Sequence, residues 1–318
     1  MTADGTEVFD YESKFGNWEN RSSVRNKPRR VLDHVGKPLL FFPSELVPAV
    51  HHPLVVDRGP EVLDQMLVRS LYQYLHFTTV LEQVAVLPVT ARLSLNRAGV
   101  DIPEGMRSDA FKITTDEAWH AQFSHDFINE VAAVTRISSG SVVEPVFARR
   151  LDRMRADFEP SEQHLVDLVF AVVSETLVSS LLSDIPNDRR LPKPVRELVA
   201  DHAADEGRHN AYFRSFLRVL WPALSERERW AIGPRIPELV SIFLYPDLDA
   251  VQLALTESGF SNDEAKLVVA DTYTPDSAVY DIRQAARSTV RSFGEVGALD
   301  DPATLDAFVV AGFREGLA

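Results

Sequence analysis

The chain has 318 residues, of which 45% are apolar and 25% charged, with a formal net charge of −14 and no cysteine. This composition is that of an ordinary soluble globular protein, and the length is enough for one large domain. Without cysteine there can be no disulfide, iron–sulfur cluster or thiolate zinc site, and we expect a cytoplasmic protein. The excess of negative charge argues against a nucleic-acid partner.

No apolar run of about 18 residues stands out, which predicts that no segment spans a membrane. The first twenty residues lack a charged start followed by an apolar stretch, so no secretion signal is expected. A group of arginines on one helix is usually a solvated face and less often a docking surface. Such a group is formed here by Arg149, Arg150, Arg153 and Arg155.

Residues 1–57 are rich in proline and arginine and show little periodicity. We expect an extended arm that wraps the core. Its positively charged stretch 20–30 should lie on the surface. The apolar anchors of the arm are predicted to be Leu39, Leu40, Phe41 and Phe42.

The first long helical pattern begins at Pro60 and ends near residues 96–99. It is apolar over much of its circumference, as a central bundle helix should be. Glu82 stands in its middle among apolar residues, and Pro88 predicts a kink one turn later. Residues 100–113 are expected to form a loop.

Two further long helices are expected after this loop. One is capped by Thr114 or Thr115 and carries Glu117 and His120 one turn apart. After a more polar, peripheral helix over roughly 143–157, the other begins at Ser161 and is strongly apolar up to residue 182. Glu175 is the only carboxylate in the apolar part of that helix.

A fourth long helix is predicted from Pro192 and Pro194, which suit a first turn and precede apolar residues at helical spacing. Offsets of three and four residues bring side chains to one face of a helix. His202, Glu206 and His209 therefore form a column of imidazole, carboxylate and imidazole. Such a column beside a buried apolar stripe is costly unless something neutralises it, and a metal ion would do so.

The rest of the chain is predicted to form shorter helices without any cluster of metal-binding side chains, over 225–244, 248–257, 261–271, 276–294 and 301–316. Strand signals are scarce, so we expect an all-α fold. The expected organisation is one domain, 1–318, with a ferritin-like four-helix bundle as its core. The arm would be 1–57, the bundle 58–221 and the peripheral helices 222–318.

The four long helices together carry a lone glutamate on two of them and a Glu-x-x-His pair on the other two. This is the pattern of di-iron carboxylate bundles, in which four carboxylates balance two divalent irons and open positions remain for dioxygen. His202 adds a third imidazole one turn before the last glutamate. The predicted ligands are Glu82, Glu117, His120, Glu175, His202, Glu206 and His209.

Each of these residues also has a plainer interpretation. A single Glu-x-x-His pair is usually surface chemistry, but two pairs with interleaved mid-helix glutamates are far less expected by chance. Glu82 and Glu175 could be buried carboxylates paired with arginine, although neither has an arginine within one turn. His202 could support a ligand from behind rather than bind metal, and the same supporting role is open to Asp116 and Asp205.

The other histidines do not extend the pattern. His76 lies off the face of Glu82 and is expected to be a packed core residue. Four others are expected at the surface, at a rim or in a loop: His51, His52, His125 and His164.

At these positions the sequence resembles the p-aminobenzoate N-oxygenase family, the non-haem di-iron arylamine oxygenases of antibiotic biosynthesis. The resemblance lies in Glu82, in the Glu-Ala-Trp-His segment 117–120, in Glu175 and in the His-Ala-Ala-Asp-Glu-Gly-Arg-His segment 202–209. The third histidine distinguishes this family from the common ferritin-like oxygenases, reductase subunits and desaturases, which use two.

The resemblance implies a function. The reduced di-iron site would use dioxygen and electrons from an external donor to oxidise an amine to a hydroxylamine, and often onward to nitroso and nitro products. The third histidine would tune the iron. Family members are commonly homodimers, and the substrate would be a small amine that is either free or tethered to a carrier protein.

Other di-iron functions stay open at this point. A radical-generating reductase subunit would want a tyrosine one turn beyond His120, where Ser124 stands. A ferritin is about half as long. A fatty-acyl desaturase or C-hydroxylase would have to bind an acidic carrier protein, and this chain is acidic as well. A non-catalytic iron-binding protein would hold iron without reacting with dioxygen.

The substrate pocket does not follow from the sequence, because its residues would come from several helices. An arginine such as Arg287 could hold a substrate carboxylate, but such a residue is more often part of a surface ion pair.

Overall fold

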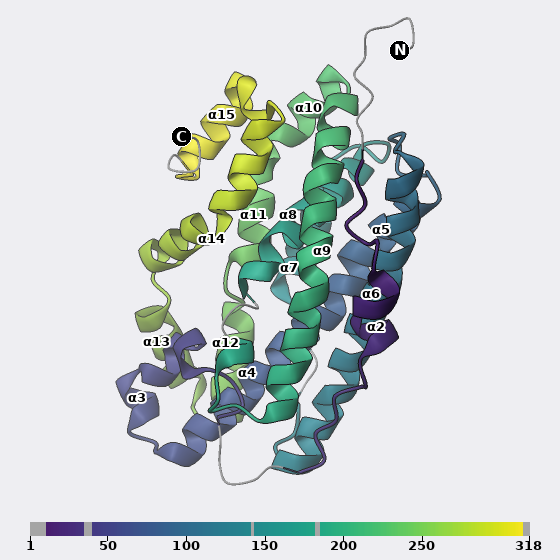
Figure 1. Ribbon diagram of the computed structural model, residues 1–318. Coiled ribbons are helices and arrows are strands. Elements are labelled where there is room, and N and C mark those ends of the chain that lie inside the picture. The colour runs from purple at the N-terminus through teal and green to yellow at the C-terminus, as the bar shows by residue number, and fades with distance from the viewer. Residues whose placement is uncertain (1–10, 35–39, 141–142, 182–184, 314–318) are drawn as a thin grey trace, which may run out of the picture.

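The computed structural model describes residues 11–34, 40–140, 143–181 and 185–313. Over these residues it is helical and contains no β-strand, which confirms the all-α class. Four long helices run side by side through the centre of the molecule (Figure 1). They are α4 (Pro60–Leu81), α6 (Glu104–Thr135), α8 (Gln163–Leu181) and α9 (Lys193–Ala223).

Shorter helices surround this bundle. Before α4 lie α1 (Trp18–Arg21), α2 (Ser23–Asn26) and α3 (Pro53–Val56), with the 3-10 turns Ser44–Leu46 and Pro48–His51. α7 (Val146–Ala156) and the turn Ile185–Asn187 flank α8. After α9 come α10 (Glu226–Ile232), the turn Gly233–Arg235, α11 (Ile236–Leu244), α12 (Leu248–Glu257), α13 (Asn262–Thr272), α14 (Pro275–Glu295), the turn Ala298–Asp300 and α15 (Pro302–Val310).

The first bundle helix changes pitch where the proline kink was expected, but before the proline rather than at it. A π-helical turn, Glu82–Val86, separates α4 from α5 (Leu87–Ser94). Pro88 has no N–H to donate to the carbonyl of Val84, and that carbonyl instead accepts a hydrogen bond of 3.3 Å from Arg155. Pro88 therefore imposes a local widening of the helix, and Arg155 stabilises it. The widening begins at Glu82.

The second bundle helix is longer than expected. The predicted loop over 100–113 is wrong beyond Pro103, because α6 begins at Glu104 and its first turns bury a stripe of apolar side chains. Thr114 and Thr115 do not cap a helix, since their hydroxyls donate to carbonyls one turn earlier in α6, at 2.8 and 2.9 Å.

Helix ends elsewhere differ by smaller amounts. The expected helix over 225–244 is two helices, α10 and α11, because Pro234 and Pro237 restart the backbone between them. α8 begins at Gln163 rather than at Ser161, and the last described helix ends at Val310 rather than at 316.

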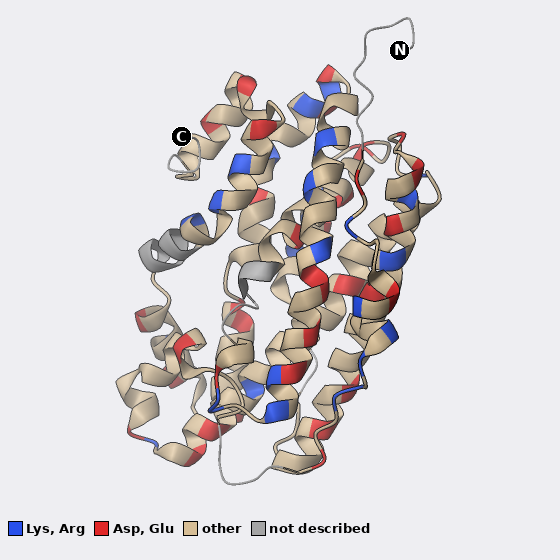
Figure 2. Cartoon of the chain, in the orientation of Figure 1, with Lys and Arg blue, Asp and Glu red and all other residues tan. Residues whose placement is uncertain are grey.

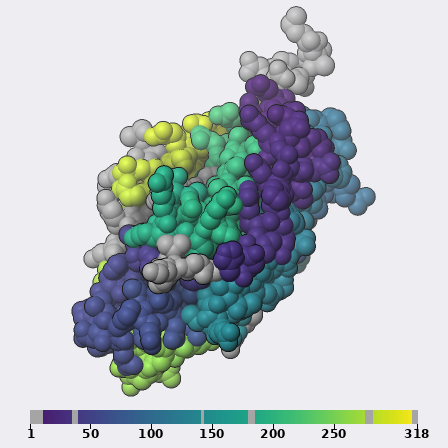
Figure 3. Space-filling view, turned by 60° about the horizontal axis from the view of Figure 1, so that its bottom comes forward, coloured from purple at the N-terminus to yellow at the C-terminus, as the bar shows by residue number. Residues whose placement is uncertain are grey.

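The amino-terminal arm is extended and lies against the bundle. We call residues 11–34 the N-terminal strap; in Figure 3 it runs in purple over the surface beside the bundle helices, and α2 contacts both α6 and α9. Phe42 is buried, while Leu40 and Phe41 pack partly buried against the core; Leu39 lies outside the described residues. The expectation that 20–30 lies on the surface is wrong for two serines, Ser22 and Ser23, which are buried because their polar groups bond into the bundle.

One stretch, Glu226–Glu257, has a window of mean hydropathy 1.3 and could cross a membrane by length and composition alone. The structure divides this stretch into α10, α11 and α12 and buries the apolar face of α11 in the protein core. Such a match is weak evidence for a membrane span. The absence of a membrane span stays a prediction, and so does the organisation as a single domain. Acidic residues are spread along the helices of the described part of the chain, in keeping with the net charge of −14 (Figure 2).

The packing beneath α7 makes a test of the core. Phe170 is fully buried, and its ring centroid lies 6.2 Å from that of Phe147 and 6.3 Å from that of Phe243. We expect Phe170→Ala to lower the free energy of unfolding by about 3–5 kcal/mol, through lost burial and the cavity left behind. Denaturant unfolding followed by circular dichroism measures this.

The matched control is Phe111→Ala, because Phe111 is 54% exposed on α6. Its effect should stay within about 0.5 kcal/mol. Equal losses of stability in the two variants would contradict this account of the core.

Candidate metal centre

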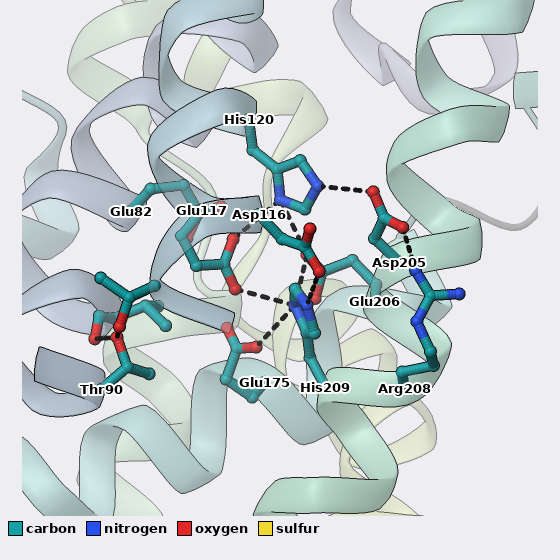
Figure 4. A network of polar contacts seen from close by, with 12 residues as sticks. Glu82, Thr90, Asp116, Glu117, His120, Glu175, Asp205, Glu206, Arg208 and His209 are labelled. Atoms are coloured by element: carbon teal, nitrogen blue, oxygen red, sulfur yellow. Dashed lines mark hydrogen bonds and ion pairs between the residues drawn. The ribbon is translucent and has the colours of Figure 1, made fainter. Parts of the chain in front are cut away.

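The structure brings all seven predicted ligand residues into one buried space. Glu82 comes from the π-helical turn that follows α4, Glu175 from α8, and the two Glu-x-x-His pairs from α6 and α9 (Figure 4). None of the seven is more than 1% exposed. Local helical geometry explains the pairs, because residues three or four apart share a face, and the bundle then turns the four faces inward.

Two glutamates occupy the middle of this space and face two histidines. Glu117 lies 2.8 Å from Nδ1 of His120 and 2.8 Å from Nδ1 of His209. Glu206 lies 3.4 Å from each of the same two nitrogens. These two carboxylates are therefore shared between the two halves of the cluster.

The other three residues belong to one half or the other. His202 places Nε2 3.2 Å from Glu206 and 3.9 Å from Glu82, and its ring centroid is 4.3 Å from that of His120. Glu175 lies on the opposite side, 3.7 Å from Nδ1 of His209. One half thus has two imidazoles and a terminal glutamate, and the other has one imidazole and a terminal glutamate.

This arrangement fits metal ions. Three sets of ligand atoms lie mutually within 4.8 Å: Glu82, His120, His202 and Glu206; Glu117, His120, Glu206 and His209; and Glu82, Glu117 and Glu175. Six of the seven residues have a buried nitrogen or oxygen with no hydrogen-bond partner among the described residues. Buried polar atoms without partners are costly, and cations coordinated by oxygen and imidazole nitrogen would satisfy them.

The carboxylates divide into two kinds by protonation. Burial, reinforced by the neighbouring glutamates, raises the pKa of Glu82 and of Glu175 well above the usual range. Burial also opposes ionisation of Glu117 and Glu206, but His209 and His120 outweigh it and lower both pKa values. Burial therefore favours the protonated form of the two terminal glutamates, and the histidines favour the ionised form of the two shared ones.

The histidines also divide into two kinds, by the direction in which their pKa is shifted. Burial would lower the pKa of His120 and His209, but Glu117 and the surrounding acceptors raise both pKa values well above normal. Burial and the nearby His120 instead lower the pKa of His202, despite Glu206. His202 is thus neutral without metal, with one ring nitrogen turned toward the cluster.

Each histidine is also held from behind, through the ring nitrogen that points away from the cluster. Nε2 of His120 donates to Asp205 at 3.2 Å, and Nε2 of His209 donates to Asp116 at 3.2 Å. These contacts cross between helices, since Asp116 precedes Glu117 on α6 and Asp205 precedes Glu206 on α9 (Figure 4). Such carboxylate–histidine pairs fix which ring nitrogen is free to bind metal.

The third histidine has a phenol behind it. The hydroxyl of Tyr74 faces Nδ1 of His202 at 3.5 Å, and its oxygen can accept the proton there. Sequence reasoning missed Tyr74, although its position two turns before Glu82 on the same helix was a usable signal. The aspartates were foreseen as supporting residues, and the structure shows that geometry.

The N-terminal strap supplies contacts that sequence reasoning did not find. Trp18 and Ser22 donate to Asp116, the backbone N–H of Ser23 donates to Asp205, and the ring of Phe15 stacks on His209 with centroids 6.0 Å apart. These residues are about 90 to 190 positions away from their partners along the chain. No local pattern in the sequence signals such contacts.

None of the remaining histidines contributes to the cluster. His76 is half-buried, His125 is exposed, and His164 is half-buried away from the ligands. His51 and His52 face the Ser44 carbonyl and Asp271, respectively. Arg287 is exposed on α14, as the surface interpretation expected.

A surface cleft of about 330 Å³ lies between α7 and α11. Arg150 and Arg153 line it, and Arg150 stacks on Tyr245 at 5.0 Å. The other two arginines of the predicted group are taken up in ion pairs, Arg149 with Asp249 and Arg155 with Asp167. Half of the group is therefore internally neutralised, as expected of a solvated helix face.

The protonation pattern predicts that metal binding depends on pH. Binding with four ionised glutamates and three neutral histidines requires two protons to leave Glu82 and Glu175 and two to leave His120 and His209. Because those pKa values are raised, protons compete better at low pH, and metal affinity should rise with pH. Calorimetric titration of the metal-free protein in buffers of different ionisation heat counts the protons released; release of none would contradict the pattern.

The comparisons with known proteins agree with this geometry. The chain is 27% identical over 300 residues to the 4-aminobenzoate N-oxygenase of Streptomyces thioluteus, an alignment covering 91% of this chain and 86% of that protein. The sequence model of the family described as p-aminobenzoate N-oxygenase AurF matches residues 21–297. That match covers the whole bundle and every residue of the cluster, and the chain belongs to the p-aminobenzoate N-oxygenase AurF family.

Proposed function

We propose that this protein is a non-haem di-iron N-oxygenase that oxidises the amino group of an arylamine. The observation that carries the proposal is the cluster itself, with four carboxylates and three imidazoles within one buried space. Family membership supports N-oxygenation of an arylamine over desaturation or carbon hydroxylation. Ser124, buried where a radical-generating reductase would need a tyrosine, gives that alternative no support.

Two iron ions suit the ligand set by charge and by ligand type. Four glutamates carry four negative charges when ionised, which two divalent ions balance. Glu117 and Glu206 would hold both ions, because each contacts His120 and His209. Glu82 and His202 would complete one ion's ligands, and Glu175 those of the other.

The iron pair would supply the activation of dioxygen, with electrons from an external reductant. For the first oxidation the balance is an amine, one dioxygen, two electrons and two protons giving a hydroxylamine and water. The relative's printed name makes an aminobenzoate-like arylamine the first substrate to test. Further oxidation to nitroso and nitro products is part of the proposal.

The protein's own side chains exclude water and fix the ligands. The ring of Phe123 lies 5.5 Å from His120 and 5.8 Å from His202 between centroids, and Phe15 covers His209. The two aspartates hold His120 and His209 with Nδ1 toward the cluster. A homodimer, a separate electron donor, a cytoplasmic location and the absence of a nucleic-acid or membrane partner stay predictions.

The experiment that tests the function is turnover by iron-loaded protein. Purified protein is reduced anaerobically, mixed with 4-aminobenzoate and oxygen, and followed by optical spectroscopy and mass spectrometry of the products. Hydroxylamine, nitroso or nitro products that appear only with iron would support N-oxygenation. Iron that is held without oxygen consumption in the presence of reductant and amine would instead identify a non-catalytic iron-binding protein.

Glu206 is the residue whose loss should be most damaging, because it contacts all three histidines of the cluster. We expect Glu206→Ala to reduce bound iron from about two ions per chain to well under one and to abolish turnover. Iron content by mass spectrometry measures this. Glu226→Ala, at an exposed position of α10, is the control and should keep its iron; full iron binding by Glu206→Ala would remove Glu206 from the ligand set.

Loss of His202 should affect the reaction with dioxygen more than it affects folding. Its ring contacts one half of the cluster only, so we expect His202→Ala to keep the helical circular dichroism spectrum and most of its iron. Product formation should fall at least about tenfold, as is typical when a group that tunes a metal is removed. Unchanged product formation would show that the third imidazole is not used.

A further inference from the structure

The N-terminal strap reaches the cluster through one carboxylate in particular. The indole N–H of Trp18 lies 2.9 Å from both oxygens of Asp116, and the hydroxyl of Ser22 donates to the same carboxylate at 2.5 Å. The third donor to Asp116 is Nε2 of His209. All four residues are buried, so water cannot replace any of these contacts.

The hydroxyl of Ser22 does not cap the helix that it precedes. Ser22 is the N-cap residue of α2, and an N-cap serine normally accepts from a backbone N–H of the first turn. Ser22 makes no such capping bond and turns its side chain to Asp116 instead. The hydroxyl therefore contributes to the cluster and not to the local helix.

The carboxylate on the other side of the cluster is held differently. Asp205 accepts from the backbone N–H of Ser23 at 3.1 and 3.2 Å and forms an ion pair with Arg208. Asp116 has no ion pair with an arginine or lysine among the described residues, and its donors other than His209 are neutral. The strap thus holds Asp116 with uncharged hydrogen bonds, whereas a cation from α9 helps to hold Asp205.

We propose that Trp18 and Ser22 are positioning residues for His209 and, through it, for one of the two metal positions. The inference rests on the proposed metal site. A tryptophan N–H can only donate, so Asp116 must present its oxygens as acceptors to both Trp18 and His209. Bonding to both oxygens fixes the plane of the carboxylate. The carboxylate in turn fixes the orientation of the His209 ring, with Nε2 toward Asp116 and Nδ1, the nitrogen that would bind metal, toward the cluster.

The contrast between the aspartates makes this effect selective. Loss of the strap's donors would let Asp116 rotate and loosen His209, which serves the half with Glu175. His120 and His202, on the other half, would keep Asp205 and Tyr74 behind them. One metal equivalent should therefore weaken and the other should not.

The test titrates metal-free protein with Co²⁺ under anaerobic conditions and follows the visible absorption of the bound ion. We expect Trp18→Phe and Ser22→Ala each to weaken one of two Co²⁺ equivalents by about 10- to 100-fold and to alter its spectrum. The other equivalent should bind as in the unmodified protein. Trp230→Phe, at a side chain that is 58% exposed, is the matched control and should change neither equivalent.

A coupling measurement separates positioning from general stability. In an Asp116→Asn background, adding Trp18→Phe should lower the Co²⁺ affinity little further, because Trp18 acts through the Asp116 carboxylate. Arg208→Gln should instead weaken binding of the other Co²⁺ equivalent, because Arg208 pairs with Asp205 behind His120. Additive effects of Trp18→Phe and Asp116→Asn, or equal weakening of both equivalents by the strap variants, would overturn the inference.

Two outcomes distinguish this inference from the proposed function. Unmodified protein that binds two Co²⁺ ions while the Trp18 and Ser22 variants bind them equally well would overturn the role of the strap and leave the metal site standing. Unmodified protein that binds no Co²⁺ would overturn both.

Discussion

The structure depends on one electrostatic constraint, which is that four carboxylates and three imidazoles share a space closed to water. Isolated charges in such a space are costly, so each must be paired, protonated or bound to a cation. The protein itself provides two of these, the pairing of opposite charges and the protonation of carboxylates. Glu117 and Glu206 face His120 and His209, while burial keeps protons on Glu82 and Glu175. The ligand-bearing faces of all four long helices are arranged around this balance.

The two Glu-x-x-His helices support one another rather than standing as independent units. Each carries an aspartate just before its glutamate, and each aspartate holds the histidine of the opposite helix. A shift of α6 against α9 would therefore disturb both histidines together, which ties the geometry of the cluster to the packing of the bundle. The symmetry is broken by His202 on one half and by the neutral donors of the N-terminal strap on the other.

The sequence was enough to predict the four long helices and to pick out the seven residues that the structure brings together. Both depend on short-range rules, since a spacing of three or four residues fixes a shared face wherever a helix forms. The start of α6 was missed because Pro103 and Gly105 look like loop residues while the buried stripe behind them is sparse. The π-helical turn and the strap contacts depend on partners far away in the chain, such as Arg155 for the Val84 carbonyl and Asp116 for Trp18. No local periodicity carries that information.

The protonation states also explain how such a centre can be built before any metal arrives. The raised pKa values favour protons on Glu82, Glu175, His120 and His209, whereas the lowered ones favour ionised Glu117 and Glu206 and a neutral His202. Two divalent ions would bring four positive charges, which equals the charge of the four protons that these residues would release. Protons could therefore be exchanged for cations at the cluster without a change in buried charge. What the exchange requires is that each imidazole already turns the nitrogen that would bind metal toward the cluster, and that orientation is what Asp116, Asp205 and Tyr74 maintain.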